Sequence, residues 1–352
     1  MNDQRITTMV TNDNNNAASK NAPTVSVVMI TYNHARYIEE AITSILKQDF
    51  SGSLELIIGD DCSTDITTNI VRHFHQLHPS KIKLIKSDSN VGMQANARRC
   101  IEACTGEYIA FCEGDDFWSD PEKLEKQIRI LRSNPDVGAV HSDFSHVRLI
   151  NGKWKALRSF NRSYRREIPQ GRVFDQLLIG NFIQTCTLCV CAEQIMAFLN
   201  SELPIDSYCV GDWPLCLYIS ASHEIAYIDE PLATYRLTPN SITNSGHERD
   251  IARAENSMNM IDDFCMQYLA PERIRIQASN MAMKQILFLA SISANTLTFE
   301  KYWHKIYLTD PAYLEPFRFQ LLRFIVNTSG LRSLYACFRS VVDTIKPLKK
   351  YR

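Results

Sequence analysis

Short runs of β-branched and aliphatic residues alternate with amphipathic segments along the first part of the chain. Apolar runs at residues 25–30, 54–58, 82–86 and 108–112 have the length and composition of strands buried on both faces of a sheet. Between the first two runs, apolar residues of 37–46 recur at helical spacing. Strands that alternate with helices in this way predict a mainly parallel sheet with right-handed crossovers. We therefore expect an α/β fold flanked by helices.

The regular alternation stops after an apolar run at residues 137–141. Asn151–Gly152 predicts a hairpin turn. The elements expected beyond it are a short helix at 171–179, a strand at 185–191, a helix through about 221 that opens near Asp212, and a strand at 225–228. From residue 250 onward the pattern is mostly helical, so a helical extension should follow the sheet.

These patterns divide the chain into three expected regions: a disordered lead at 1–23, the α/β domain at 24–246 and a helical region at 247–352. The lead is polar and has no apolar stretch of the kind that a signal peptide needs. No window of about 18 uninterrupted apolar residues occurs later, so we do not expect a membrane-spanning helix.

Composition narrows the function classes only slightly. The net charge of −1 gives no support to nucleic-acid binding. Eleven cysteines are an odd number, and they are scattered through predicted strands and helices, which favours free thiols in a reducing compartment. We therefore expect a cytoplasmic protein, with a peripheral position at the inner face of the cell membrane as a second option.

Carboxylates follow two of the predicted strands. Glu113, Asp115 and Asp116 come directly after the fourth apolar run, and Asp60 and Asp61 come after the second. The carboxyl ends of parallel strands meet at one edge of an open sheet, where such folds bind ligands. Crowded anions repel one another unless a cation joins them, and oxygen ligands favour magnesium or manganese. The alternative is a set of acidic loops that cap backbone amides.

The ordered set of motifs resembles the family 2 inverting glycosyltransferases, whose catalytic domain has the GT-A fold. The motifs that carry the resemblance are Val25 to Asn33, Asp60-Asp61-Cys62-Ser63-Thr64-Asp65, Asn90-Val91-Gly92, Gly106 to Ala110 and Glu113-Gly114-Asp115-Asp116. The resemblance covers roughly residues 24–241 and includes Gly211-Asp212-Trp213 and Tyr235-Arg236-Leu237-Thr238. Each motif alone is weak, but their order on alternating strands is specific.

The resemblance implies roles for particular residues. The nucleotide would be bound by Thr31, Tyr32, Asn33, Asp60, Asp61 and Glu113, the donor sugar or diphosphate by Asp116 and Arg236, and the metal, Mn²⁺ or Mg²⁺, by Asp115. Asp212 would be the general base, although a helix N-cap is its alternative role. Two positions depart from the family pattern. Glu113 replaces the more common Asp, and Thr238 stands where a metal-binding His is often found.

The function that follows is metal-dependent, inverting transfer of a sugar from a nucleotide-sugar donor, with a UDP-sugar favoured, to a hydroxyl of a glycan or lipid-linked acceptor in surface polysaccharide synthesis. One alternative is a sugar-phosphate nucleotidyltransferase, which would be expected to show a Gly-rich, basic loop after the first strand. Thr31-Tyr32-Asn33-His34 is not such a loop. The non-enzyme alternative is a nucleotide- or glycan-binding module with a decayed site.

The end of the chain is basic and amphipathic. Residues 317–352 contain eight Lys and Arg against the single acid Asp343. Leu331, Leu334, Tyr335, Phe338, Val341, Val342 and Ile345 form an apolar stripe at helical spacing. A basic amphipathic helix of this kind can lie on an anionic membrane surface. The alternative is a helix packed on the catalytic domain with a solvated basic face.

Overall fold

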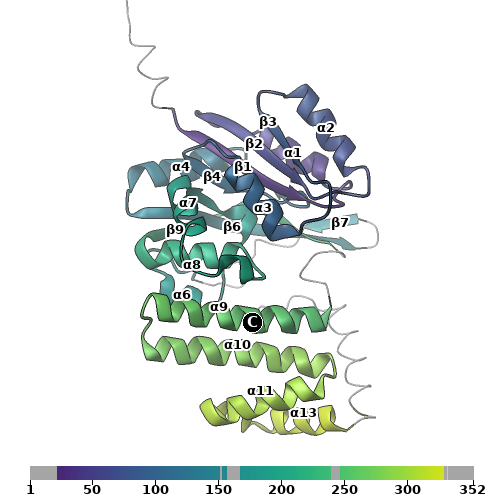
Figure 1. Cartoon of the computed structure of the whole chain (residues 1–352), viewed down its shortest axis with the longest axis vertical. Helices are drawn as coiled ribbons and strands as arrows, with labels where there is room; N and C mark the ends of the chain where they lie inside the picture. The colour runs from purple at the N-terminus through teal and green to yellow at the C-terminus, as the bar shows by residue number, and fades with distance from the viewer. Residues whose placement is uncertain (1–21, 151–152, 157–166, 239–245, 329–330, 332–352) are drawn as a thin grey trace, which may run out of the picture.

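A computed structural model describes residues 22–150, 153–156, 167–238, 246–328 and 331 (Figure 1). In these residues, nine strands form one sheet in the order β3-β2-β1-β4-β8-β6-β9-β5, and β7 pairs with β6. Helices cover the sheet, and further helices extend from one side of it (Figure 1). The predicted α/β class with a C-terminal helical extension is confirmed.

The first half of the sheet is parallel. It consists of β1 (Thr24–Thr31), β2 (Ser53–Asp60), β3 (Ile82–Lys86) and β4 (Tyr108–Phe111), and β1 lies between β2 and β4. Helices α1 (Ile38–Leu46), α2 (Thr67–Leu77) and α3 (Met93–Glu102) connect these strands. The four strands coincide closely with the apolar runs, because local pattern alone marks a doubly buried strand.

The second half of the sheet is mixed and differs in detail from the sequence expectation. Its strands are β5 (Phe117–Trp118), β6 (Val137–Ile150), β7 (Lys153–Ala156), β8 (Cys189–Cys191) and β9 (Glu224–Leu237). The prediction of a strand at 185–191 is mostly wrong, because Thr185–Thr187 form a 3₁₀ turn and only Cys189–Cys191 form a strand. The strand expected at 225–228 continues to Leu237, since it pairs in parallel with the long β6. The antiparallel β6–β7 pair confirms the hairpin, although its turn residues lie outside the described part.

Alternating side chains give the sheet two apolar faces. Val27 and Met29 of β1 join one core cluster with residues of α1, α2 and α4 (Lys123–Ser133), and Val28 joins the other. The second cluster includes residues of α3, α6 (Phe174–Ile179), α7 (Ala192–Leu199) and α8 (Asp212–Ser222). Helices therefore cover both faces, and the loops at the strand ends remain available for a site.

The C-terminal region is a set of packed helices. These are α9 (His247–Gln267), α10 (Glu272–Ile292), α11 (Thr296–Thr309), the short α12 (Pro311–Leu314) and α13 (Phe317–Asn327). Met260 and Phe264 of α9 join the core under the sheet, while α10, α11 and α13 share a separate core. None of the described helices has the length and hydrophobicity required to cross a bilayer. All the described cysteines are free thiols, and most are buried.

Candidate active site

The acidic loop after β4 lies directly against the end of β1. The Gly114 N–H donates to the Ile30 carbonyl at 3.0 Å. A Cβ atom at position 114 would lie 2.7 Å from Thr31 Oγ1 and 2.8 Å from Ile38 Cδ1, so only glycine fits there. This close approach places Glu113 and Asp115, on either side of the glycine, beside the residues that follow β1.

Glu113 is held as an incompletely paired carboxyl group. Its Oε2 atom is buried and has no hydrogen-bond partner in the structure. Burial, with further repulsion from the charges of Asp115 and Asp212, raises the pKa of Glu113 to about 8. A buried carboxyl oxygen without a donor is costly unless a ligand or a cation completes its surroundings. Glu113 therefore marks a place where an external group is expected.

Asp115 faces the loop that follows β1. One of its carboxylate oxygens lies 4.0 Å from His34 Nε2, and its side chain is 16% exposed. The other nitrogen of the imidazole, Nδ1, is buried without a partner. The sequence motifs imply no role for His34. The acidic loop and the end of β1 therefore place a carboxylate and an imidazole side by side.

Asp116 and Arg236 are turned into the protein. Asp116 Oδ1 accepts a 2.9 Å hydrogen bond from the Arg236 N–H of β9, and burial raises the pKa of Asp116 well above its usual value. The Arg236 guanidinium donates to the Asp115 carbonyl at 2.8 Å, pairs with Glu40, and lies 4.4 Å over the Phe117 ring. Both side chains thus fasten the acidic loop to β9 and α1.

Asp212 begins helix α8 near the same loop. Its Oδ2 atom accepts a 2.7 Å hydrogen bond from Thr185 Oγ1, and its Oδ1 atom accepts one from the Trp213 N–H at 2.8 Å. Burial raises the pKa of Asp212, and these two hydrogen bonds oppose part of the rise. The Thr185 hydroxyl also faces the Glu113 carboxyl. The 3₁₀ turn at Thr185 therefore connects the two acids that the sequence places about a hundred residues apart.

The loops after β1 and β2 are held together by Asn33 and Asp60. Asn33 has a φ angle of +58°, and its Oδ1 atom accepts hydrogen bonds from the Thr64 N–H at 2.8 Å and the Asp65 N–H at 3.3 Å. Asp60 is 2% exposed and accepts from the Ser63 N–H and hydroxyl and from the Thr68 hydroxyl. Tyr32, by contrast, is 42% exposed beside these loops.

Asp61 joins the loop after β2 to the loop before α3. Its two carboxylate oxygens accept 2.8 Å hydrogen bonds from the N–H groups of Val91 and Gly92, one each, and the residue is 4% exposed. Gly92 has a φ angle of +88°, which a side chain would disfavour. The structure thus brings the predicted nucleotide-binding residues together at one edge, with the Asp60 and Asp61 carboxylates engaged in local hydrogen bonds.

The carboxyl groups of Glu113 and Asp115 could hold a divalent cation only together with further ligands from a substrate. Across the described residues, no group of three or more His, Cys, Asp or Glu side chains has the arrangement of a metal site. Asp115 and the unpartnered Glu113 oxygen are nevertheless hard donors of the kind that magnesium and manganese prefer. Phosphate oxygens would have to complete the coordination.

Three residues of this site, His34, Thr185 and Glu40, are not indicated by the sequence alone. His34 was visible as a polar residue in the turn after β1, but its approach to Asp115 depends on the contact of Gly114 with β1. Thr185 lay in an expected strand, and only the 3₁₀ turn directs its hydroxyl to Asp212. No local signal connects Glu40 with Arg236, which is almost two hundred residues away.

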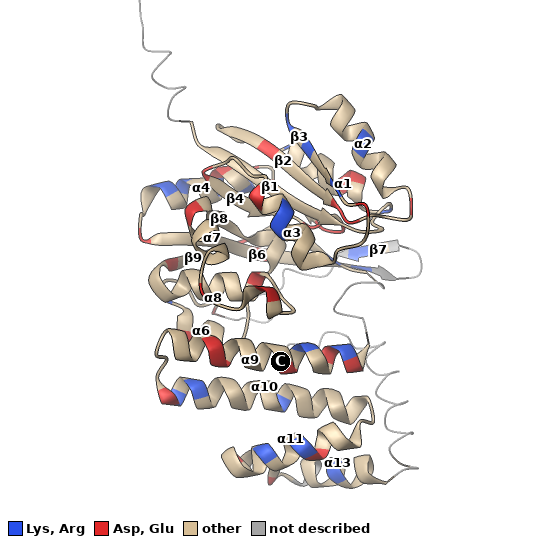
Figure 2. Ribbon diagram, in the orientation of Figure 1, with Lys and Arg blue, Asp and Glu red and all other residues tan. Residues whose placement is uncertain are grey.

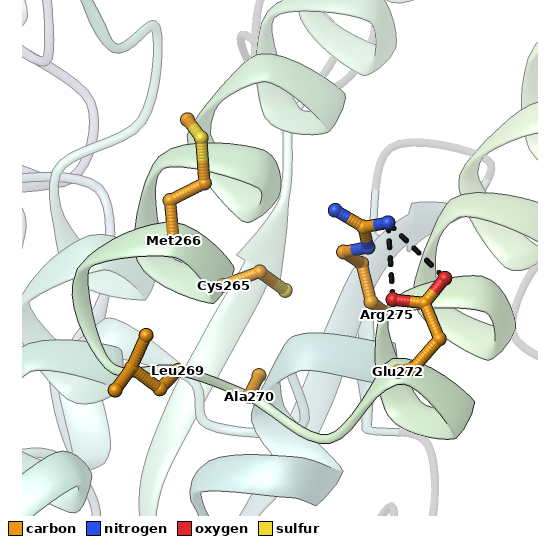
Figure 3. Close-up of a pocket in the computed structure, with 6 residues that line it drawn as sticks. All are labelled: Cys265, Met266, Leu269, Ala270, Glu272 and Arg275. Atoms are coloured by element: carbon orange, nitrogen blue, oxygen red, sulfur yellow. Dashed lines mark hydrogen bonds and ion pairs between the residues drawn. The ribbon is translucent and has the colours of Figure 1, made fainter.

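A shallow pocket elsewhere has no such chemistry. It has a volume of about 420 Å³ at the turn between α9 and α10, and Figure 3 shows its lining residues. Glu272 and Arg275 pair with each other at 3.0 Å, and the remaining lining is Cys265, Met266, Leu269 and Ala270. The edge of the sheet remains the candidate active site.

Comparison with known proteins gives relatives of this chain. Residues 26–192 match the family described as "Glycosyl transferase family 2". An uncharacterized protein of Mycobacterium tuberculosis is 33% identical over 225 residues, which make up 63% of this chain and 61% of the relative. The chain thus spans about three fifths of that relative's length. TuaG of Bacillus subtilis, whose name assigns it to teichuronic acid biosynthesis, is 28% identical over 63% of this chain and 82% of its own.

Solved structures show the same fold at low identity. The S. aureus protein TarS, residues 1–349 with UDP, matches with a TM-score of 0.57 and 17% identity over 90% of this chain and 91% of that chain. The mannosyltransferase PcManGT of Pyrobaculum calidifontis, with GDP-Man and Mn²⁺, matches with a TM-score of 0.53 and 18% identity over 90% of this chain and 88% of that chain.

Proposed function

We propose that this chain transfers a sugar from a nucleotide-sugar donor to an acceptor hydroxyl, with the help of a divalent cation and with inversion at the anomeric carbon, because residues 26–192 match glycosyltransferase family 2. The observation that carries this proposal is the meeting of two acidic elements at one edge of the sheet. Glu113 and Asp115 at the end of β4 provide carboxyl oxygen donors, and the Thr185 hydroxyl lies between the carboxyl groups of Glu113 and Asp212.

In this proposal Asp212 removes the proton from the acceptor hydroxyl. The raised pKa of Asp212 suits this role, because a stronger base accepts a proton more readily. Thr185 and the Trp213 N–H fix the orientation of the carboxylate. General-base assistance is typically worth about 10²–10⁴-fold in rate. A single displacement needs no covalent nucleophile.

Asp115 and Glu113 would bind the donor diphosphate through Mn²⁺ or Mg²⁺, which would supply positive charge for the leaving group. Arg236 and Asp116 hold the Asp115 backbone in place through the contacts described above, and Arg236 would add positive charge near the diphosphate. Gly114 permits the approach of the loop to β1. Thr31, Tyr32, Asn33, Asp60 and Asp61 would surround the base and ribose.

The comparisons support the donor class and suggest the acceptor. The titles of the TarS and PcManGT structures record UDP and GDP-Man, and Mn²⁺ accompanies the latter. We favour a UDP-sugar as the donor. The name of TuaG supports an acceptor in surface polysaccharide synthesis, either a glycan or a lipid-linked precursor. We therefore propose a polysaccharide-assembling transferase.

The test is a panel of nucleotide sugars with Mn²⁺ or Mg²⁺, in which release of the nucleoside diphosphate is followed. We expect release from one donor by the wild type and none by Asp115→Ala, because that variant loses the main oxygen donor for the cation. Glu122→Gln is the matched control, since this acid lies at the start of α4 with its side chain 61% exposed.

Calorimetry of nucleoside diphosphates with Mn²⁺ completes the test. Metal-dependent binding that Asp115→Ala abolishes would support the site even when release needs an acceptor. Binding that persists unchanged in Asp115→Ala would overturn the ligand assignment. Metal-dependent binding without transfer to any acceptor in a cell-wall extract would favour the non-catalytic binding module.

A further inference from the structure

The hairpin of β6 and β7 projects from the edge of the sheet that carries the candidate active site. β6 runs in the same direction as β4, because both strands pair antiparallel with β8. Val140 of β6 and Ala110 of β4 both pair with Cys189, so they lie at the same level of the sheet. From that level β4 ends one residue later, at Phe111, whereas β6 continues to Ile150. Figure 1 shows β7 on the side of the sheet where β1 and β2 end.

Trp154 of β7 exposes part of its ring at this edge. The residue is 40% exposed, and its ring meets the ring of Tyr37 edge to face, with 5.8 Å between the centroids. The buried guanidinium of Arg236 lies 5.9 Å from the centre of the indole. Lys155, a basic position on β7 in Figure 2, is directed to the other face of the hairpin by the alternation of a strand. Trp154 therefore faces the start of α1 and β9.

Two sets of contacts connect Trp154 with the acidic loop. In the first, the ring of Tyr37 lies 6.4 Å from the ring of His34, and His34 Nε2 lies 4.0 Å from the Asp115 carboxylate. In the second, the guanidinium of Arg236, which faces the indole, donates to the Asp115 carbonyl at 2.8 Å. The indole is thus fixed next to the acid that would bind the cation.

Glu40 of α1 places a carboxylate near the same ring. The guanidinium of Arg236 pairs with Glu40 and also faces Trp154, and the Glu40 side chain is 62% exposed. A sugar ring can use both groups, because its C–H bonds pack on the electron-rich face of an aromatic ring and its hydroxyls donate to a carboxylate. A single exposed apolar residue is ordinary on a protein surface. An indole that is already fixed beside a carboxylate at a candidate active site is a better ligand-binding group, because little side-chain freedom is lost on binding.

We propose that Trp154 is a stacking platform for a pyranose ring of a substrate, and that Glu40 accepts hydrogen bonds from the hydroxyls of this sugar. The proposal rests on the sugar transfer proposed above, and it adds a binding group outside the motifs of the sequence. Both the donor and a glycan acceptor contain pyranose rings, so the experiment has one arm for each. The base of the nucleotide is expected at the ends of β1 and β2, and it is not the ligand assigned to Trp154.

The donor arm is calorimetry of UDP-glucose, UDP-N-acetylglucosamine and GDP-mannose in the presence of Mn²⁺, each beside its nucleoside diphosphate. If the donor sugar stacks on the indole, Trp154→Ala should lose about tenfold in affinity for a nucleotide sugar and keep its affinity for the nucleoside diphosphate. An equal loss for both ligands would overturn the proposal, because Trp154 would then only support the nucleotide site.

The acceptor arm is saturation-transfer NMR with maltohexaose and chitohexaose as probes. If a sugar of the acceptor stacks on the indole, the wild type should transfer saturation to the ring C–H protons of these oligosaccharides, and Trp154→Ala should lose most of this transfer. An effect in either arm supports the proposal and assigns the sugar to that substrate. The proposal is wrong if Trp154→Ala equals the wild type in both arms, or if neither oligosaccharide binds and donor affinity is unchanged.

Further variants separate stacking from structural support. Trp154→Tyr keeps an aromatic face and should retain most of the binding that Trp154→Ala loses. Tyr307→Ala is the matched control, because Tyr307 is an aromatic residue that is 60% exposed on α11, away from the site. Circular dichroism checks that each variant is folded. Asp115→Ala in the same calorimetry distinguishes the two proposals: metal-dependent binding that this variant retains would contradict the proposed function, whereas its loss beside an unaffected Trp154→Ala in both arms would contradict the stacking platform alone.

Discussion

The acidic pair at the end of β2 and the acidic loop at the end of β4 resemble each other in the sequence but have different surroundings in the folded chain. Asp60 and Asp61 accept hydrogen bonds from five donor groups of the neighbouring loops and the first turn of α2. Glu113 has a buried oxygen without any donor, and its pKa is raised to about 8 by burial. The first pair therefore shapes loops, whereas the second loop is incomplete without an external group.

The two acidic elements therefore have different roles along one edge of the sheet, because one fixes loops and the other can bind an external group. Carboxylates that are satisfied by backbone N–H groups fix the loops that would surround a nucleotide. A buried carboxylate that lacks hydrogen-bond donors is destabilised in the free protein, and binding of a cation or a proton removes part of this free-energy cost. Three substitutions test the contrast, in order of their expected effect.

The largest effect is expected from Asp212→Asn. The amide keeps the shape of the side chain but cannot accept the proton, so kcat should fall by about 10²–10⁴-fold. Donor binding should stay within a factor of about two, because the residue serves the acceptor side of the reaction. Steady-state kinetics, with calorimetry of the nucleoside diphosphate, measures both quantities. Near-normal turnover by the folded variant would remove Asp212 from the role of base.

Asp61→Asn tests the other kind of carboxylate. The amide oxygen can accept from only one of the two N–H groups, of Val91 and Gly92, while its NH₂ group faces the other. We expect the free energy of unfolding to fall by about 1–3 kcal/mol. Hydrogen exchange at residues 90–92 should accelerate. Urea unfolding and exchange mass spectrometry measure these effects.

The control for Asp61→Asn is Asp88→Asn, which changes an exposed acid in the same neighbourhood. Its effect on unfolding should stay within about 0.5 kcal/mol. Should Asp61→Asn be equally harmless while nucleotide binding collapses, Asp61 would be a direct ligand-binding group rather than a loop-fixing one, and the contrast between the two acidic elements would fail.

The positions of both acidic elements are visible in the sequence, because strand ends and acidic residues follow local patterns. The four parallel strands and the positions of Glu113, Asp115 and Asp212 follow from apolar runs and short motifs. Their surroundings do not, since these depend on contacts between distant segments. The antiparallel β8 lies between β4 and β6, and this non-local pairing brings Thr185 to Asp212.

Lys123 illustrates the same limit of local pattern. It stands at the start of α4, where a charged residue would ordinarily face solvent, yet it is fully buried, and burial lowers its pKa to about 8. Its ammonium group donates to Gln127 at 2.6 Å and lies 4.1 Å over the Trp118 ring. Trp118 in turn donates to the Phe111 and Cys186 carbonyls. No local periodicity indicates this buried polar support of the acidic loop.

The smallest effect on activity is expected from Thr185→Val, and this variant tests the role of Asp212 through the pH dependence of kcat. This change removes the hydroxyl that hydrogen-bonds Asp212 but keeps the volume of the side chain nearly constant. Because that hydrogen bond opposes the rise of the Asp212 pKa, its loss raises the pKa further. A base with a higher pKa is protonated over a wider acidic range, so the acidic limb of the kcat profile should move to higher pH. Activity above that limb should change by a factor of about ten or less.

Thr185→Ser keeps the hydroxyl and should restore the wild-type profile. A limb that stays in place in Thr185→Val would mean that the group that titrates in the reaction is not Asp212.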